Sequence, residues 1–292
     1  MAFQGVYTAL VTPFTTKGAV DDGALKRLVE EQIEAGVAGL VPAGTTGESP
    51  TLTHEEHLDV VAKVVEWAQG RVPVIAGAGS NSTDEALHLT RQAKELGASA
   101  TLQVVPYYNR PNQEGLYRHF MALADVGLPV LVYNIAPRTA RNLETDTLMR
   151  LAQHPQIVGV KEASGDVGQI MDVIARRPKG FSVLSGDDVL TLPLMALGGD
   201  GVISVISHLV PQEFSTLTRA ALAGNFEQAR EVHYRTVLPV AKALSGDVNP
   251  VPVKTALALQ GRLSEAFRLP LVPIEEAKKQ AMQTALKALG LL

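Results

Sequence analysis

A (β/α)8 barrel (a TIM barrel, class α/β) with a C-terminal helical appendage is the fold that this sequence predicts. Short apolar runs rich in β-branched residues alternate eight times with longer amphipathic runs, which is typical of a parallel sheet covered by helices. The 292 residues leave room for one such barrel, which uses about 250 residues, and a small addition. The strand signal disappears after residue 224. We therefore expect a barrel over residues 1–224 and a helical domain over residues 225–292.

The predicted strands are continuous apolar runs, as expected for strands whose outer face is covered by helices. They are residues 6–11, 39–41, 72–76, 100–105, 130–133, 157–161, 182–184 and 201–205. Eight strand-helix units favour closure into a barrel. An open, doubly wound sheet is the alternative.

The predicted helices have recognisable ends. Two of them begin at sequences typical of capping boxes, which start at Thr53 and Ser82. Gly36, Gly70 and Gly97 stand where helices should end. In the appendage we expect helices over residues 225–244, 251–259 and 274–289, with prolines between them.

The composition excludes several classes of function. The net charge of −4 provides no basic surface for nucleic acid or for an anionic membrane. The absence of cysteine excludes disulfides, thiolate metal sites and a cysteine nucleophile. No apolar run is long enough to cross a membrane, and residues 1–5 lack the features of a signal peptide. We expect a cytoplasmic protein.

The segment after the second predicted strand, residues 42–49, is rich in glycine and hydroxyl groups. In a barrel of this kind the active site forms at the C-terminal ends of the strands. Glycine lets a ligand approach the backbone closely, and Thr45, Thr46 and the free N–H groups beside them could hold a carboxylate. A plain Gly/Thr loop is the alternative.

Aromatic and basic side chains follow the fourth and fifth predicted strands. Tyr107 and Tyr108 follow the fourth, where such residues are more often packing or interface residues than acids or bases. Tyr133 ends the fifth strand, and a phenol there can relay a proton. Arg138 comes shortly after it and suits bidentate binding of a carboxylate. A structural ion pair is the alternative for Arg138.

Lys161 is the most informative single residue, because it ends the apolar run 157–161. Lysine is rarely buried unless it is paired or functional. Desolvation at the mouth of a barrel lowers the pKa of an amine, and the neutral amine can add to a ketone to form an imine. The alternative is a salt bridge with Glu162 or another acid.

Two other motifs do not predict a cofactor. His54-Glu55-Glu56-His57 resembles a zinc-binding helix, but its histidines are three residues apart instead of four, and no third ligand is evident. The segment 77–82 follows a strand and opens a helix, but it lacks the third glycine of a dinucleotide-binding loop. We expect neither a metal nor an organic cofactor.

Several strand-end motifs occur together in a fixed order. They are Thr45-Thr46-Gly47-Glu48, Tyr107-Tyr108-Asn109-Arg110-Pro111, Tyr133-Asn134, Arg138-Thr139, Gly159-Val160-Lys161-Glu162 and Ser185-Gly186-Asp187-Asp188. This set resembles the dihydrodipicolinate synthase (4-hydroxy-tetrahydrodipicolinate synthase) family, in the N-acetylneuraminate lyase superfamily. The resemblance runs essentially from end to end. Each motif alone is weak, whereas the set is specific for the superfamily and less specific for the substrate.

The resemblance implies an enzyme, a lyase that condenses pyruvate with L-aspartate 4-semialdehyde. The product, 4-hydroxy-tetrahydrodipicolinate, lies on the route to lysine and meso-diaminopimelate. The family's pattern implies that Lys161 forms an imine (a Schiff base) with pyruvate. It also implies that Tyr133 shuttles protons and that Thr45 bridges it to Tyr108, which enters from the neighbouring subunit.

The resemblance implies substrate-binding roles as well. Thr46 would hold the carboxylate of pyruvate, and Arg138 would bind the carboxylate of the semialdehyde. Gly186 and Ile203 would contribute backbone contacts. Because the family commonly pairs dimers into tetramers, we expect a homotetramer or a homodimer.

One loop departs from the family's usual Tyr-Asn-Val-Pro-x-Arg-Thr-Gly. The proline has moved to Pro137 and the final glycine is Ala140, although Arg138 keeps its position. An alternative activity is another pyruvate aldolase, an N-acetylneuraminate or 2-keto-3-deoxy sugar acid lyase. Neuraminate lyases usually carry Ser-Thr in place of Thr45-Thr46 and lack this arginine, which favours the synthase. An alternative from another class is a non-catalytic ligand-binding barrel.

Regulated members of the family bind L-lysine as a feedback inhibitor at the tight dimer interface. The matching positions are Ser49, His54, His57, Asn81, Glu85 and Tyr107. Glu85 could pair with an amino group of lysine, while Asn81 and Tyr107 could bind its carboxylate. In the alternative, His54 and His57 are solvated residues of a first helical turn and Glu85 is only a capping-box acid.

Overall fold

Parallel strands form the centre of the structure, a computed structural model that describes residues 3–292. They are β1 (Gly5–Ala9), β2 (Gly39–Val41), β3 (Ile75–Gly77), β4 (Ala100–Val104), β5 (Val130–Asn134), β6 (Ile157–Glu162), β7 (Ser182–Ser185) and β8 (Gly201–Ser204). Residues 1 and 2, which belong to the expected barrel range and N-terminal segment, lie outside the described residues. The strand order is β2-β1-β8-β7-β6-β5-β4-β3, and a bridge between Leu40 and Val74 joins its two ends. The closed barrel confirms the predicted fold and excludes the open sheet.

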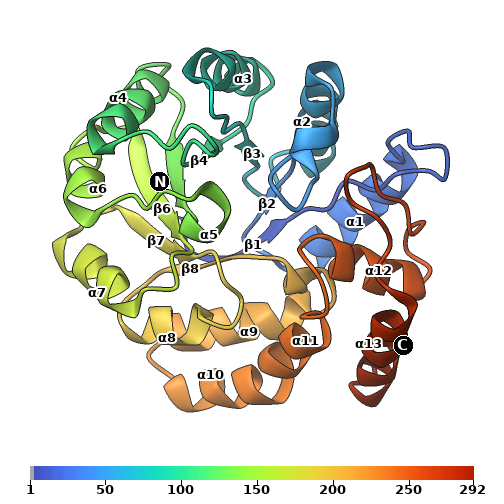
Figure 1. Cartoon of the computed structure of the whole chain (residues 1–292). Helices are drawn as coiled ribbons and strands as arrows, with labels where there is room; N and C mark the ends of the chain where they lie inside the picture. Colours follow the sequence, from blue (N-terminus) through green and yellow to red (C-terminus); the bar gives the residue numbers. More distant parts are fainter. Residues whose placement is uncertain (1–2) are drawn as a thin grey trace.

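The helices follow the strands and surround the barrel (Figure 1). They are α1 (Asp22–Glu34), α2 (His54–Ala68), α3 (Thr83–Glu95), α4 (Gln113–Ala124), α6 (Thr145–Leu151), α7 (Val167–Arg176), α8 (Thr191–Ala196) and α9 (Pro211–Leu222). Shorter helical turns lie within the loops: η1 (Ser49–Thr51), α5 (Ala136–Thr139) and η2 (Ile206–His208). All three turns follow strands at the end of the barrel where the candidate site lies.

The third strand begins later than predicted. Residues 72–76 were expected, whereas β3 is Ile75–Gly77. Pro73 has no N–H to donate to a neighbouring strand and therefore fits poorly inside a sheet. Its carbonyl still accepts a hydrogen bond from the N–H of Leu40 at 3.1 Å, which continues the contact between β2 and β3.

One of the two predicted capping boxes is complete. At the start of α2, the Thr53 hydroxyl and the Glu56 carboxylate each bind the other residue's backbone N–H. At the start of α3, Ser82 accepts a hydrogen bond from the N–H of Glu85, but the reciprocal bond is missing. The carboxylate of Glu85 is instead engaged by other side chains, so the prediction of a second full capping box was wrong.

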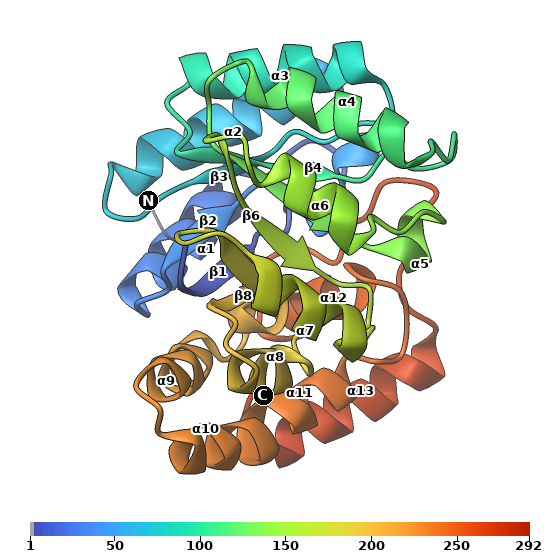
Figure 2. The same ribbon diagram turned by 90° about the vertical axis from the view of Figure 1, so that its left-hand side faces the viewer.

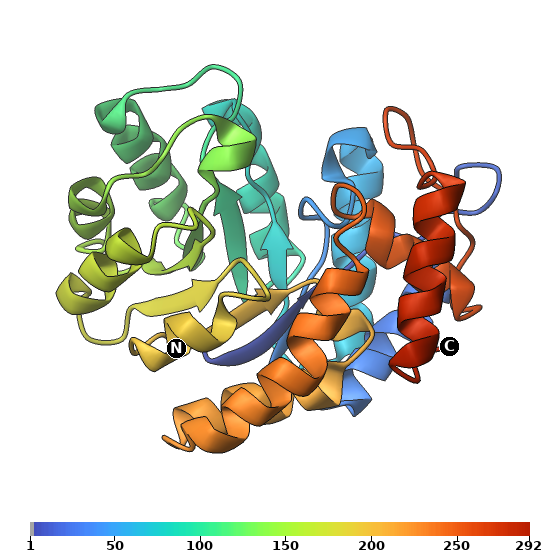
Figure 3. The same ribbon diagram turned by 60° about the horizontal axis from the view of Figure 1, so that its bottom comes forward.

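The appendage consists of helices, as predicted. They are α10 (Phe226–Val232), the π-helical turn η3 (His233–Val237), α11 (Leu238–Ala243), α12 (Val251–Leu259) and α13 (Glu276–Ala288). The helix expected over 225–244 thus contains one wider turn. Figures 2 and 3 show these orange and red helices along one side of the barrel, with α10 beside α9. Apolar residues of the appendage share the main core of the barrel. The division into two domains near residue 224 therefore stays a prediction.

Two apolar cores hold the fold together. The larger lies between the strands and the surrounding helices, and the smaller fills the inside of the barrel around Tyr7, Ile75, Leu131 and Leu184. The filled interior leaves the strand ends as the place for a ligand. Within residues 3–292, no helix has the length and apolar character needed to span a membrane.

Candidate active site

A cavity of about 840 Å³ opens at the C-terminal ends of the strands. Its wall includes Val41 of β2, Tyr133 of β5 and Lys161 of β6. The loop after β2 and the connection between α11 and α12 complete this part of the wall. The appendage therefore contributes directly to the cavity, in addition to packing against the barrel.

Lys161 lies near the end of β6, and only 6% of its surface is exposed. Its Nζ lies 4.1 Å from the ring centroid of Tyr133, the residue paired with it in β5. Burial lowers the pKa of Lys161 to about 8, with an opposing effect from the charge of Asp188. At pH 7 such a pKa leaves roughly 10% of the amine neutral, about 300 times more than an ordinary lysine has. The amine is therefore available as a nucleophile.

Glu162 does not pair with Lys161, although the sequence left that alternative open. Successive residues of a strand point to opposite faces. The Glu162 carboxylate accepts hydrogen bonds from the N–H of Ser164 at 2.7 Å and from the Asn134 amide at 3.3 Å. It anchors the loop after β6 and leaves the amine of Lys161 facing the cavity.

Gly186 makes room for the lysine. A Cβ atom at this position would lie 3.0 Å from Cε of Lys161 and 2.7 Å from Cβ of Ala163. Any larger residue would push the lysine side chain aside. Gly186 thus has a steric reason to be glycine, and it also lines the cavity.

Tyr133 is buried beside the amine. Burial raises the pKa of its phenol to about 12, an effect that the charge of Arg138 partly opposes. The phenol consequently keeps its proton at neutral pH. It can donate that proton to a substrate oxygen and recover it later, which is the chemistry expected of a relay.

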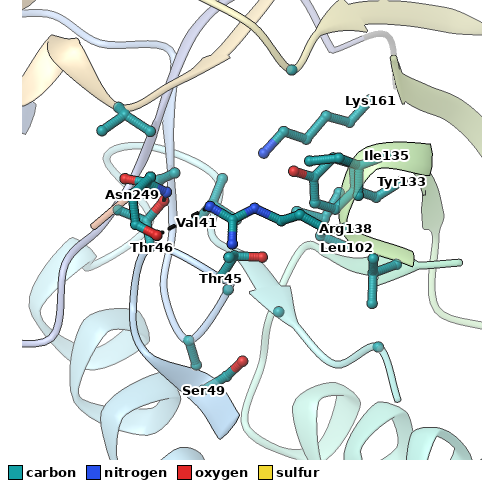
Figure 4. Close-up of a pocket in the computed structure, with 18 of the residues that line it drawn as sticks. Val41, Thr45, Thr46, Ser49, Leu102, Tyr133, Ile135, Arg138, Lys161 and Asn249 are labelled. Atoms are coloured by element: carbon teal, nitrogen blue, oxygen red, sulfur yellow. Dashed lines mark hydrogen bonds between the residues drawn. The ribbon is translucent and has the colours of Figure 1, made fainter. Parts of the chain in front are cut away.

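Polar groups from distant parts of the chain meet on the opposite wall (Figure 4). The amide nitrogen of Asn249 donates a hydrogen bond to the Thr46 hydroxyl at 2.9 Å. The backbone carbonyl of Asn249 accepts a hydrogen bond from the Arg138 guanidinium at 3.1 Å. Thr45 lies beside this group and also lines the cavity. Hydroxyl, amide and guanidinium donors thus converge where a carboxylate could bind.

Arg138 is carried by the short helix α5, which is built from the sequence that departs from the family pattern. Pro137 lies in its first turn, and Ala140 ends it with φ of +54°. The N–H of Ala140 donates to the Ala136 carbonyl at 2.8 Å. A non-glycine residue in this left-handed conformation costs about 1 kcal/mol. The altered loop is therefore well formed and still presents Arg138 to the cavity.

Asn249 and Asp188 were not among the predicted site residues, yet both line the cavity. Asp188 accepts hydrogen bonds from the N–H groups of Val205 and Ile206, each at 3.1 Å, and so fixes the loop after β8. Burial raises the pKa of Asp188 to about 6. Its place in the Ser-Gly-Asp-Asp motif was a usable signal, whereas only the fold reveals Asn249.

Two of the predicted catalytic and substrate-binding residues lie outside the cavity wall. Tyr108 is 90% exposed in the single chain and has a φ of +72°. Such a strained conformation is common at functional sites. Ile203 is buried inside the barrel on β8, and Val205 and Ile206 line the cavity instead. The structure therefore brings Lys161 and Tyr133 together but leaves Tyr108 pointing away from the chain.

Most of the predicted lysine-binding residues line the same cavity, and the part of its wall that they form is called the second lobe below. Ser49, His54, His57, Glu85 and Tyr107 line it, whereas Asn81 does not.

Glu85 is the most heavily engaged residue of this lobe. Its carboxylate lies 2.6 Å from Nε2 of His54 and also accepts a bond from the Ser80 hydroxyl. These two bonds lower the pKa of Glu85. His57 is buried and contacts the carbonyl of Gly77 at 2.7 Å, so it is not the solvated residue of the alternative interpretation.

The fold and the site together define a Schiff-base lyase. A barrel of eight parallel strands carries a buried amine beside a protonated phenol, with carboxylate-binding donors across the cavity. The family model that matches residues 2–289 is that of the dihydrodipicolinate synthetase family. The chain belongs to this family.

Curated relatives agree over the full length. The chain is 51% identical to the 4-hydroxy-tetrahydrodipicolinate synthase of Maridesulfovibrio salexigens, covering 100% of both chains. It is also 51% identical to the enzyme of that name from Syntrophus aciditrophicus, covering 99% of both.

Solved structures of the family superpose closely. Dihydrodipicolinate synthase from Aquifex aeolicus matches with a TM-score of 0.97 and 46% identity. The enzyme from Acinetobacter baumannii complexed with pyruvate, and that from Cyanidioschyzon merolae with lysine bound, each match with a TM-score of 0.96 and 43% identity. Each of these three matches covers 99% of both chains.

Proposed function

We propose that this chain condenses pyruvate with L-aspartate 4-semialdehyde to form 4-hydroxy-tetrahydrodipicolinate, a step toward diaminopimelate and lysine. The observation that carries the proposal is the amine of Lys161, buried beside the phenol of Tyr133 in the cavity at the strand ends. The full-length relatives named for this activity support it.

The first step is formation of the imine. The neutral amine of Lys161 adds to the carbonyl carbon of pyruvate, and the resulting carbinolamine loses water. Loss of a proton from the methyl group then gives an enamine, for which the iminium acts as electron sink. Thr46 and the backbone beside Thr45 hold the carboxylate. The complex of the Acinetobacter baumannii enzyme with pyruvate supports the choice of ketone.

The second step joins the two substrates. The enamine carbon attacks the aldehyde carbon of the semialdehyde, and the aldehyde oxygen takes up a proton. The amine of the semialdehyde then attacks the imine carbon, closes the ring and releases Lys161. Arg138 binds the carboxylate of the semialdehyde, while Gly186, which lines the cavity, contributes a backbone contact. These steps use side chains and the two substrates, with no metal or organic cofactor.

The proton transfers require a relay. Tyr133 exchanges protons with the reacting atoms, and Thr45 connects its phenol to Tyr108 of a neighbouring subunit. Tyr133 and Thr45 line the cavity of one chain, whereas Tyr108 projects from it. An exposed tyrosine at the mouth end of a barrel fits a residue that completes the site of another copy.

The test of the function is an assay of condensation with pyruvate and aspartate semialdehyde, run beside cleavage of N-acetylneuraminate and 2-keto-3-deoxygluconate. We expect activity on the first pair of substrates only. Cleavage of a sugar acid without condensation would replace the proposal by the alternative aldolase. Failure to bind pyruvate at all would favour a non-catalytic barrel.

A homodimer or a homotetramer of two dimers is the proposed assembly. The exposed side chains of Tyr107 and Tyr108 form one candidate interface. Exposed apolar side chains on α7 and after α8, among them Met171 and Leu197, offer a second. Two surfaces of this kind on one chain are what a dimer of dimers requires.

Subunit mixing tests the role of Tyr108. Tyr108→Phe and Lys161→Ala should each be nearly inactive, but exchange of subunits between them should restore activity. A mixed dimer has one site with an intact Lys161 and an intact Tyr108 from the partner, so random exchange yields about a quarter of the wild-type sites. No recovery, despite exchange verified by mass spectrometry, would show that Tyr108 does not act across subunits.

Inhibition by L-lysine is proposed for the second lobe of the cavity. Glu85 can pair with an amino group of lysine by exchanging its contact with His54. Tyr107 lines the same lobe and can bond the carboxylate. The lysine-bound structure of the Cyanidioschyzon merolae enzyme supports this proposal.

Glu85→Ala is expected to relieve inhibition by lysine while leaving turnover without lysine nearly unchanged. The lost charge-assisted contact should weaken lysine binding by about 1.5–3 kcal/mol, or roughly 10- to 100-fold. Asp84→Ala is the matched control, because Asp84 carries the same charge in the same helical turn but is exposed. Titration calorimetry and inhibition curves measure both. Equal sensitivity of the two variants would rule out the proposed pairing.

The cytoplasm remains the expected compartment. Cell fractionation with an antibody against the chain would test this prediction.

A further inference from the structure

A fully buried ion pair lies directly behind the substrate-binding wall. Nζ of Lys254, on α12, lies 2.5 Å from Oε1 of Glu48, which follows the Thr45-Thr46 loop. Both side chains have an exposure of 0%, lower than in any other salt bridge found in residues 3–292. Neither Glu48 nor Lys254 was predicted from the sequence to be a site residue.

The surroundings of this pair keep water away from both charges. The Lys254 ammonium lies 4.3 Å from the ring centroid of Phe14 and 4.9 Å from that of Phe267. The second carboxylate oxygen of Glu48 accepts a hydrogen bond from the N–H of Arg268 at 3.4 Å. Such cation-π contacts and backbone donors stabilise the two charges where solvent cannot.

The ion pair connects the same two segments that the cavity brings together. Glu48 belongs to the loop that carries Thr46, and Lys254 lies near the start of α12, the helix that begins just after Asn249. The hydrogen bond between Asn249 and Thr46 joins these segments at the cavity wall, and the ion pair joins them behind it. Asn249 in turn holds Arg138 through its carbonyl. Glu48 also has a left-handed φ of +54°, so the loop needs an anchor.

Stability alone gives a weak reason for such a pair. The desolvation of two buried charges consumes most of their attraction, and a well-packed apolar pair is often as stable. A specific distance and direction between two segments, in contrast, is something that an ion pair provides and an apolar contact does not. Ser49 and Val253, the sequence neighbours of Glu48 and Lys254, line the cavity, so a displacement of the pair reaches the cavity wall.

We propose that Glu48 and Lys254 are positioning residues, which set the affinity for the substrate carboxylates by fixing the loop after β2 against α12. The proposal rests on the proposed function for the identity of the substrates. It predicts a separation of effects. Removal of the pair should weaken substrate binding, whereas the chemistry at Lys161, which belongs to β6, should be less affected.

The test is the double variant Glu48→Met/Lys254→Met, which replaces the pair by apolar side chains of similar length. Pyruvate affinity is measured by borohydride trapping against pyruvate concentration, which requires no second substrate. We expect half-saturation to rise between about 10- and 100-fold, with the trapped amount at saturation unchanged. KM for both substrates should rise more than kcat falls, and the midpoint of thermal unfolding should stay close to that of the wild type.

The control is Glu231→Met/Arg235→Met, which removes an exposed ion pair of the appendage and should leave pyruvate affinity unchanged. If the main double variant does not fold, Glu48→Gln decides, because it keeps the length and an acceptor for Lys254 while removing the charge. An unchanged half-saturation in a folded variant would overturn the positioning role. Trapping of pyruvate with no condensation by the wild type would instead contradict the proposed function and leave this measurement valid.

Discussion

Lys161→Met is expected to abolish condensation and, at the same time, to make the folded protein more stable. Without the amine no imine forms, and loss of a covalent nucleophile typically lowers turnover by a factor on the order of 1000 or more. The gain in stability follows from burial. Met has a similar shape and requires no hydration, whereas burial holds the pKa of Lys161 at about 8.

The pH dependence of this gain has a definite sign. The unfolded chain binds a proton at Lys161 up to pH 10.5, while the folded chain releases it above about 8. The free-energy cost of burying the charged amine is therefore fully present below pH 8. This cost decreases as the pH rises from 8 to 10.5, and it is absent above 10.5, where the amine is neutral in both the folded and the unfolded chain. At pH 7 the variant should be more stable by on the order of 1–3 kcal/mol.

Thermal unfolding of wild type and variant at pH 7 and pH 10 measures this effect. The difference between their midpoints should be smaller at pH 10. Lys179→Met, at an exposed position, is the control and should show neither the loss of activity nor the gain in stability. A Lys161→Met variant that condenses both substrates, or that is less stable than wild type at pH 7, would contradict the account.

Arg138→Ala is the variant with the second largest expected effect. The guanidinium is a charge-assisted donor at the cavity, and its loss should lower kcat/KM for the semialdehyde by about 100-fold. Imine formation with pyruvate should remain largely intact, because Lys161 and Tyr133 keep their places. Arg118→Ala removes an exposed arginine of α4 and serves as the control. Normal condensation by Arg138→Ala would require another group to bind the second carboxylate.

Borohydride trapping separates the two effects in this variant. The imine with pyruvate should form at a near-normal rate. Semialdehyde that is added before the borohydride should no longer consume this imine, so the amount of reduced adduct should stay high. Loss of the adduct itself would mean that Arg138 acts on pyruvate or on the fold of α5.

The barrel could be predicted from the sequence because its signals are local. Each strand is a short apolar run, and the βαβ alternation leaves few topologies. The errors arose from a proline inside an apolar run and from a local capping signal that had a tertiary competitor. Pro73 delayed β3, and Glu85 exchanged its capping bond for contacts with His54 and Ser80.

The candidate site was predictable where chemistry coincides with a strand end. Lys161 and Tyr133 lie near the ends of neighbouring strands, and parallel pairing then brings them side by side. Asn249 could not be found in this way, because it approaches Thr46 only when the appendage packs on the barrel. The same holds for the contact between Glu48 and Lys254, which depends on long-range packing and not on spacing.

The most direct test of the central claim is reduction with borohydride in the presence of pyruvate, followed by mass spectrometry of the digested chain. The reduced pyruvate adduct should be found on the peptide that contains Lys161 and should be absent from Lys161→Met. An adduct on a different lysine, or none at saturating pyruvate, would contradict the account.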